Sequence, residues 1–90
     1  MHTILVSYDL KAPGRNYDDL WEHLRSYSDY IKPLESVWIL KTSRSTKEVR
    51  DAIKKHVDSN DRVLAINISG DAWASYNLAS SDATWLKENL

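Results

Sequence analysis

A single carboxylate, Asp9, is the side chain in this 90-residue sequence whose type and place best suit chemistry. It ends a short β-type run, residues 3–8, and a loop signal containing Pro and Gly follows at residues 11–14. Folds that combine strands and helices place ligand and metal groups at the carboxyl ends of their strands. Asp9 is therefore the candidate catalytic and metal-ligating residue, with a turn-forming aspartate as the alternative.

One carboxylate makes a weak site for Mg²⁺ or Mn²⁺, because hydrolysis of a phosphodiester normally needs more than one oxygen ligand. A symmetric dimer changes this count, since two copies of Asp9 that face each other across a two-fold axis would share one cation and an activated water. Asp71, after the last strand-like run, is a more distant carboxylate. No cofactor is therefore certain, and Mg²⁺ or Mn²⁺ stays an open alternative.

The sequence carries none of the stronger catalytic signatures: it has no Walker loop, no G-x-G-x-x-G and no H-E-x-x-H pattern. It has no cysteine, which excludes a disulfide framework, a thiolate metal site and a cysteine nucleophile. The serines have no evident base partner. We expect His2, His23 and His56 to be ordinary structural or surface residues.

The charge balance bears on the partner. Twelve Lys and Arg against thirteen Asp and Glu leave a formal net charge of −1. A dedicated nucleic-acid binder usually shows a net basic surface or stripe, so nucleic acid stays open as a partner without support from the net charge. A basic cluster between residues 41 and 55 alternates with acidic residues, and we interpret it as a solvated helix face.

The apolar runs and the missing cysteine bear on location. The longest apolar runs, 4–6, 37–40 and 63–66, have the length of strands, and no basic segment followed by a long apolar stretch opens the sequence. We therefore expect no membrane partner. Because absence of cysteine is ordinary in a reducing compartment, the predicted location is cytoplasmic.

The elements that would position Asp9 alternate between strands and helices. A helix is predicted after the first strand, because Asn16 can cap it and apolar residues recur at helical spacing. That apolar face consists of Tyr17, Leu20, Trp21, Leu24 and Tyr27. A second helix opens at a capping box formed by Ser45 and Glu48. Residues 30–42 between them are extended, as one bent strand or two.

The last elements complete the predicted fold. Residues 63–68 form another strand, and a short helix is expected from about Asp82, capped by Ser80 or Ser81. Right-handed crossovers place both main helices on one face of the sheet. The predicted class is α/β (α+β): a ferredoxin-like βαββαβ single domain over residues 1–90, with residues 71–90 as a C-terminal Trp-rich extension.

The second face of the sheet needs a cover. The strand runs are nearly continuous in apolar residues rather than alternating, which indicates that both faces are buried. Either the tail between Trp73 and Trp85 or another subunit would cover this face. A homodimer is the hypothesis that follows.

Four short motifs, in order, resemble those of a known group of proteins. They are Val6-Ser7-Tyr8-Asp9-Leu10, Pro13-Gly14-Arg15-Asn16-Tyr17, Glu35-Ser36-Val37-Trp38 and Asn60-Asp61-Arg62. The arrangement, over about residues 3–70, resembles the SinR-like family of small prokaryotic proteins. It is also similar to the small CRISPR-associated (Cas2-like) proteins of the spacer-acquisition complex.

The resemblance implies a ferredoxin-like fold and a dimer joined through the sheets, with Asp9 placed for a divalent metal near the dimer axis. Ser36 would assist catalysis, and Lys11 or Arg15 would steady the phosphate. Two functions follow. The first is a dimeric interaction or scaffold module. The alternative is a Mg²⁺- or Mn²⁺-dependent endonuclease that cuts RNA or DNA with Asp9 from both subunits.

Overall fold

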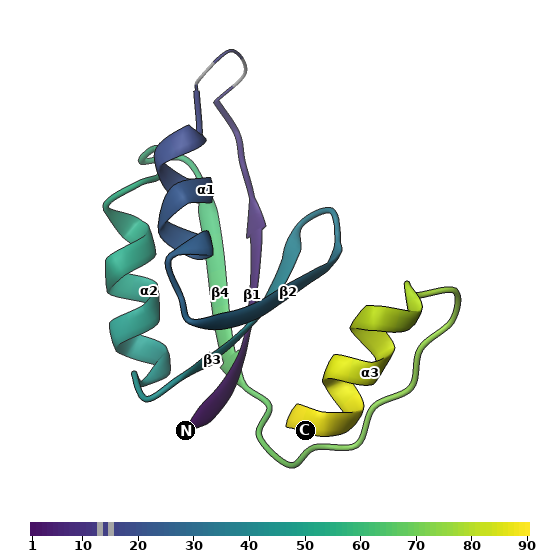
Figure 1. Cartoon of the computed structure of the whole chain (residues 1–90). Coiled ribbons are helices and arrows are strands. Elements are labelled where there is room, and N and C mark those ends of the chain that lie inside the picture. The colour runs from purple at the N-terminus through teal and green to yellow at the C-terminus, as the bar shows by residue number, and fades with distance from the viewer. Residues whose placement is uncertain (13, 15) are drawn as a thin grey trace.

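The structure is a computed structural model that describes residues 1–12, 14 and 16–90. It is a small compact α+β domain with one four-stranded antiparallel sheet and three helices (Figure 1). In chain order the elements are β1 (His2–Asp9), α1 (Asp18–Arg25), β2 (Asp29–Leu34), β3 (Val37–Thr42), α2 (Thr46–Lys54), β4 (Arg62–Asn67) and α3 (Ser80–Asn89).

The strand order across the sheet is β2-β3-β1-β4. β1 lies between β3 and β4, and its pairing with β3 runs from His2 opposite Thr42 to Ser7 opposite Val37. On its other side β1 pairs with β4, where Asp9 lies opposite Arg62. The extended segment 30–42 is two strands, because the chain turns at residues 35–36 and β2 pairs antiparallel with β3.

The helix starts show which local signals determine structure. α2 has the predicted capping box: the Glu48 backbone N donates to Ser45 Oγ at 3.2 Å, and the Ser45 backbone N donates to Glu48 Oε1 at 3.0 Å. The residue that precedes α1 is Tyr17, which makes no side-chain cap. The prediction that Asn16 occupies the cap position was therefore one residue off, although its Oδ1 accepts from the Asp18 backbone N at 2.8 Å.

The start of α3 corrects the expected serine cap near residue 82. The helix begins at Ser80, its N-cap is Ala79, and no side chain caps it. The backbone N groups of Asp82 and Ala83 both donate to the Ala79 carbonyl, at 3.0 and 3.1 Å, so the first turn forms through the backbone alone.

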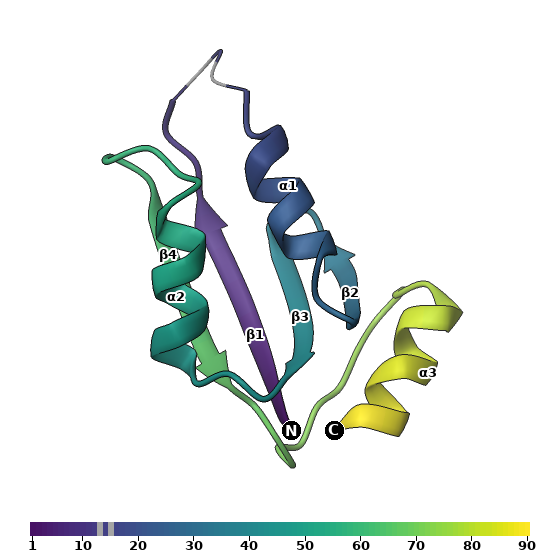
Figure 2. The same cartoon turned by 60° about the vertical axis from the view of Figure 1, so that its left-hand side comes forward.

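Helices α1 and α2 both pack on one face of the sheet (Figure 2). Strand side chains alternate between faces, so every second residue of β1 and β3 points toward these helices. The buried cluster consists of Ile4, Val6, Leu20, Leu24, Trp38, Leu40, Val49 and Ile53. The apolar face predicted for the first helix packs in this layer, with Leu20 and Leu24 fully buried.

The opposite face of the sheet is covered only in part, by α3. Leu86 is buried against Ile31 and Ile39, at the β2–β3 side. Toward the other edge, Leu64 and Ile66 of β4 remain 57% and 44% exposed. The expectation that this face is wholly buried is therefore wrong for the chain alone, because α3 packs toward β2 and β3 and leaves Leu64 and Ile66 of β4 exposed.

Three polar contacts hold α3 in place. Trp85 Nε1 donates to Asp29 Oδ1 at 2.8 Å. The carbonyl of Asn89 accepts from Thr3 Oγ1 at 2.9 Å and from Lys41 Nζ at 3.2 Å. The tail thus docks, as its apolar content predicts. Within the part of the chain that the structure describes, no helix combines the length and apolar character needed to cross a bilayer.

Candidate functional site

Asp9 is the last residue of β1 and points to the face opposite α1 and α2, since it alternates with the buried Val6 and the half-buried Tyr8. Its side chain is 55% exposed, and its Oδ2 lies 2.9 Å from Lys11 Nζ. An exposed pair of this kind contributes only about 0–1 kcal/mol to stability. The structure therefore brings two of the predicted site residues together, in solvent.

The donor set around Asp9 does not fit a divalent cation in one chain. Lys11 neutralises the carboxylate, and the strand neighbour on the same face is another cation, Arg62. Among residues 1–12, 14 and 16–90, no three His, Asp or Glu side chains gather in a way that could hold a metal ion. A hard cation needs several oxygen ligands, so a second carboxylate would have to come from another chain.

Ser36 lies in the turn between β2 and β3, next to the end of β1. Its carbonyl accepts from the Tyr8 backbone N at 3.3 Å, and the residue is exposed. The structure thus places the backbone of Ser36 one residue from Asp9. Asp71, the distant carboxylate, follows β4 beyond Asn67, which pairs with Ile4. It therefore lies toward the other end of β1 and cannot join Asp9.

Tyr8 is a polar residue of this end that sequence reasoning missed. Its hydroxyl donates to the Glu35 carbonyl at 3.2 Å and accepts from Trp38 Nε1 at 3.1 Å. Burial raises the pKa of Tyr8, and the smaller effect of the Trp38 hydrogen bond lowers it. The phenol therefore stays protonated at neutral pH and ties the β2–β3 turn to β1.

An aromatic cluster lies between this end of the sheet and α1. The rings of Tyr8 and Trp21 are 5.6 Å apart, those of Trp21 and Trp38 6.5 Å, and those of Tyr30 and Trp38 5.5 Å. Tilted and offset pairs at such distances are favourable beyond the area that they bury. The cluster accounts for four of the nine Trp and Tyr residues as packing rather than as a ligand site.

Asp61 is the best-connected carboxylate near the site, although the sequence indicates only a turn at residues 58–61. It accepts from the Lys11 backbone N at 2.6 Å, from the Tyr17 hydroxyl at 2.8 Å and from the Asp58 backbone N at 2.7 Å. These bonds join the α2–β4 loop to the segment after β1. Only the Asp58 bond is local, so spacing in the sequence could not reveal the other two.

The predicted site is thus assembled in part. Asp9, Lys11 and the Ser36 backbone meet at one end of the sheet, whereas Arg15 lies outside the described residues. Two of the histidines expected to be ordinary structural or surface residues are in contact: the rings of His23 and His56 stack 4.9 Å apart.

Comparison with known proteins adds no family to this description. No protein-family model matches the chain. No solved structure matches it significantly.

Proposed function

We propose that this chain is a dimeric interaction or scaffold module of SinR-like or Cas2-like type, with a ferredoxin-like fold and a Trp-rich C-terminal extension. The fold is supported by the order of elements up to β4 and by the strand order β2-β3-β1-β4, which suit a βαββαβ unit. The helix α3 and the segment before it then form the extension.

The observation that carries the proposal is the uncovered apolar half of the sheet. Leu64 and Ile66 are exposed on β4, beside Ser7 and Leu5 of β1 on the same face. A groove of about 280 Å³ between the sheet and the tail continues this surface from Leu5 to Trp73. An apolar face that its own chain leaves open is typical of a subunit interface.

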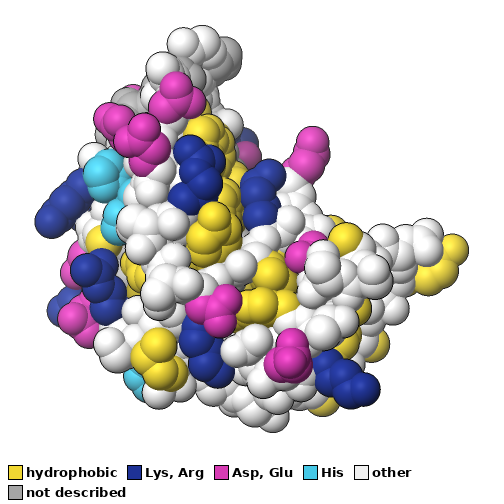
Figure 3. All heavy atoms as spheres, viewed as in Figure 1, with side chains coloured by type: hydrophobic (Ala, Val, Ile, Leu, Met, Phe, Trp, Pro, Cys, Tyr) yellow, Lys and Arg dark blue, Asp and Glu magenta, His cyan; other side chains and the backbone are white. Residues whose placement is uncertain are grey.

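A second copy is the partner that fits this face best. The face belongs to an edge strand, so two chains related by a two-fold axis would each bury the same residues. Figure 3 shows acidic and basic side chains interspersed over one face of the molecule, with no basic stripe. Together with the net charge of −1, this distribution favours a protein partner over nucleic acid.

The test is the oligomeric state, measured by sedimentation equilibrium and by light scattering after size exclusion. We expect a dimer for the wild type and a monomer for Leu64→Lys combined with Ile66→Lys. Leu34→Lys is the matched control, because Leu34 is also 57% exposed but lies on the opposite edge strand. Circular dichroism checks that each variant folds. A monomeric wild type, or a Leu34 variant that dissociates equally, would contradict the proposal.

The alternative function is a Mg²⁺- or Mn²⁺-dependent endonuclease that acts on RNA or DNA. One observation favours it: Asp9 and Leu64 point to the same open face, so a dimer through this face would bring the two Asp9 carboxylates toward the shared interface. Ser36 would assist, and Lys11 or Arg15 would hold the phosphate. The endonuclease function therefore requires that the dimer forms.

Labelled RNA and DNA, single- and double-stranded, test the nuclease function with Mg²⁺, with Mn²⁺ and with chelator. The nuclease function predicts metal-dependent cleavage that Asp9→Asn abolishes and that Asp19→Asn, a change on the exposed surface of α1, preserves. No cleavage by the wild type, or equal cleavage by both variants, leaves the scaffold function alone.

We also propose a cytoplasmic location. The sequence has no cysteine, which is usual where thiols are kept reduced. Fractionation of cells that produce the tagged chain tests this location.

A further inference from the structure

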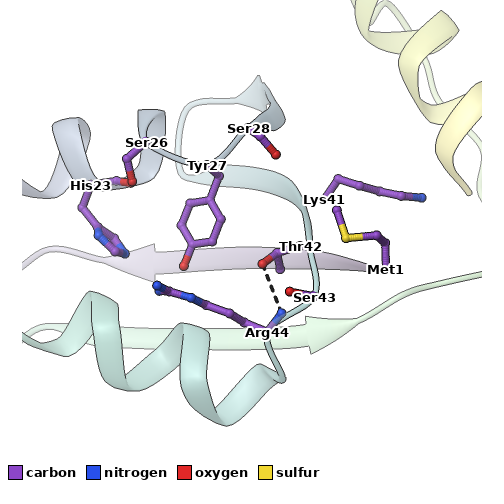
Figure 4. Close-up of a pocket in the computed structure, with 9 residues that line it drawn as sticks. All are labelled: Met1, His23, Ser26, Tyr27, Ser28, Lys41, Thr42, Ser43 and Arg44. Atoms are coloured by element: carbon purple, nitrogen blue, oxygen red, sulfur yellow. Dashed lines mark hydrogen bonds between the residues drawn. The ribbon is translucent and has the colours of Figure 1, made fainter.

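A polar pocket of about 340 Å³ lies at the end of the sheet opposite Asp9 (Figure 4). Its walls come from the end of α1, the segment before β2, and the connection between β3 and α2. The residues that matter for its chemistry are His23, Tyr27, Ser28, Ser43 and Arg44. None of the described lining residues is acidic, so the pocket presents donors and positive charge.

Two polar groups of this pocket have no hydrogen-bond partner among the described residues. His23 Nε2 and the Tyr27 hydroxyl are buried, and neither forms a hydrogen bond within the described part of the chain. A buried polar group without a partner costs stability, and each such group in a folded protein calls for an explanation. The two rings meet edge to face, 5.5 Å apart, so both groups belong to one small region.

Arg44 is the cation of the pocket. Its guanidinium carbon lies 5.8 Å from the centre of the Tyr27 ring, and Figure 4 shows its side chain extending past Tyr27 toward His23. Arg44 is exposed and forms no ion pair with a described carboxylate. It can therefore swing outward and admit an anion between its guanidinium, the Tyr27 hydroxyl and His23 Nε2.

The positive charges around His23 come from the connection before α2 and from the residues directly after it. Burial lowers the pKa of His23 most, and the positive charges of His56, Arg44 and Lys55 lower it further. The hydrogen bonds with Ser45 lower the pKa of Glu48 most, and Arg44 adds a small further lowering, so this carboxylate is already used by the capping box. Because no described acidic side chain lines the pocket, an incoming anion would offset this positive charge.

Phosphate is the anion that suits these donors. An arginine guanidinium offers paired N–H groups that match a phosphate, and hydroxyls such as those of Ser28 and Ser43 add single bonds. Lys41 also lines the pocket, but its Nζ donates to Thr3 Oγ1 and the Asn89 carbonyl, away from the other donors. We propose that this pocket binds the phosphate group of a small molecule through Arg44, Tyr27 and His23.

The test follows backbone amide resonances while inorganic phosphate, adenosine 5′-monophosphate or adenosine is added at constant ionic strength. We expect saturable shifts at residues 27, 28, 43 and 44 with both phosphate compounds, no such shifts at residues 58–61, and none with adenosine. Tighter binding of the nucleotide identifies a small phosphorylated molecule as the ligand, and equal binding identifies free phosphate. Absence of saturation with both phosphate compounds overturns the proposal.

Variants distinguish specific phosphate binding in this pocket from nonspecific attraction of phosphate to positive charge. Arg44→Gln is expected to weaken phosphate binding about tenfold or more, because it removes a hydrogen bond to a charged group. Tyr27→Phe is expected to weaken it severalfold while keeping the ring. Arg50→Gln removes the same charge from an arginine already paired with Asp51 at 2.7 Å and should leave the affinity unchanged. Equal losses in the Arg44 and Arg50 variants would contradict a specific site.

The pKa of His23 is a second measurement of phosphate binding. If His23 had a purely structural role, phosphate would not change this pKa. Bound phosphate favours the imidazolium, so saturating phosphate should raise the pKa of His23, followed through its ring protons. The Arg44→Gln variant should show this rise only at higher phosphate. A pKa of His23 that is the same with and without saturating phosphate would overturn the assignment of His23 to the site.

Discussion

The two ends of the central strand β1 differ in how completely their polar groups are paired. At the Asp9 end, the Asp61 carboxylate takes three donors, the Tyr8 hydroxyl both donates and accepts, and Asp9 is paired with Lys11. In the pocket beside the start of β1, His23 Nε2 and the Tyr27 hydroxyl are buried and form no hydrogen bond within the described residues, and the Arg44 guanidinium lies over the Tyr27 ring. One end is satisfied internally and the other keeps unused donors.

This difference indicates which end of the strand is able to bind a ligand. A group that already has good partners gains little from binding, whereas an unpaired buried donor gains the hydrogen bond that folding left out. Asp9 is the candidate site residue in the sequence, but the polar groups at its end of β1 are already paired with one another. The end with unused donors contains no motif that stands out in the sequence.

The strongest test of the satisfied end is Asp61→Ala. It leaves the Lys11 backbone N, the Tyr17 hydroxyl and the Asp58 backbone N without their acceptor. We expect a loss of about 2–3 kcal/mol in the free energy of unfolding, measured with urea. The exposed aspartate at 71, changed to alanine, is the control and should cost little. A loss no larger than that of the control would show that these bonds do not stabilise the loops.

A smaller loss is expected for Tyr8→Phe. The change keeps the ring but removes the acceptor of Trp38 Nε1 and the donor to the Glu35 carbonyl, for about 1 kcal/mol. Tyr76→Phe is the matched control, because Tyr76 is 89% exposed. Urea unfolding with near-ultraviolet circular dichroism measures both. Equal stability of the two variants would show that the hydrogen bonds of the Tyr8 hydroxyl do not stabilise the fold.

The unsatisfied end predicts a pH effect. Burial and neighbouring charges hold the pKa of His23 below its ordinary value of 6.5, so at pH values just below 6.5 the folded chain binds fewer protons than the unfolded chain. The free energy of unfolding therefore rises with pH in this window and falls on acidification. Thermal unfolding between about pH 5 and pH 7.5 should show a shallower slope for His23→Gln. The same slope in both proteins would contradict the shift.

The smallest effect is expected at Asp9 itself. Asp9→Asn breaks an exposed pair with Lys11 and should change stability by less than about 1 kcal/mol. Mg²⁺ or Mn²⁺ should raise the melting temperature of the wild type over that of the variant only if the alternative metal site forms. A large loss of stability in the variant would contradict the expectation that the exposed pair of Asp9 and Lys11 contributes little to the fold.

Part of the fold follows from local signals. The capping box of Ser45 and Glu48 starts α2 where the sequence predicts it, because both bonds lie within four residues. The apolar spacing of α1 and the apolar runs of β1 and β4 likewise place these elements, since each period determines which side chains share a face. For the site, proximity of Asp9 and Lys11 follows from their spacing of two residues.

Tertiary structure decided what depends on segments far apart in the chain. The sequence alone does not show that Asp61 would accept from Lys11 and Tyr17 or that His23 would stack on His56. Nor does it show that α3 would cover only part of one face of the sheet. Such contacts arise when the sheet brings distant loops together, and they leave no periodic trace. Local hydrogen bonds and side-chain period are therefore determined by the sequence itself, whereas the pairing of polar groups between loops is determined by the fold.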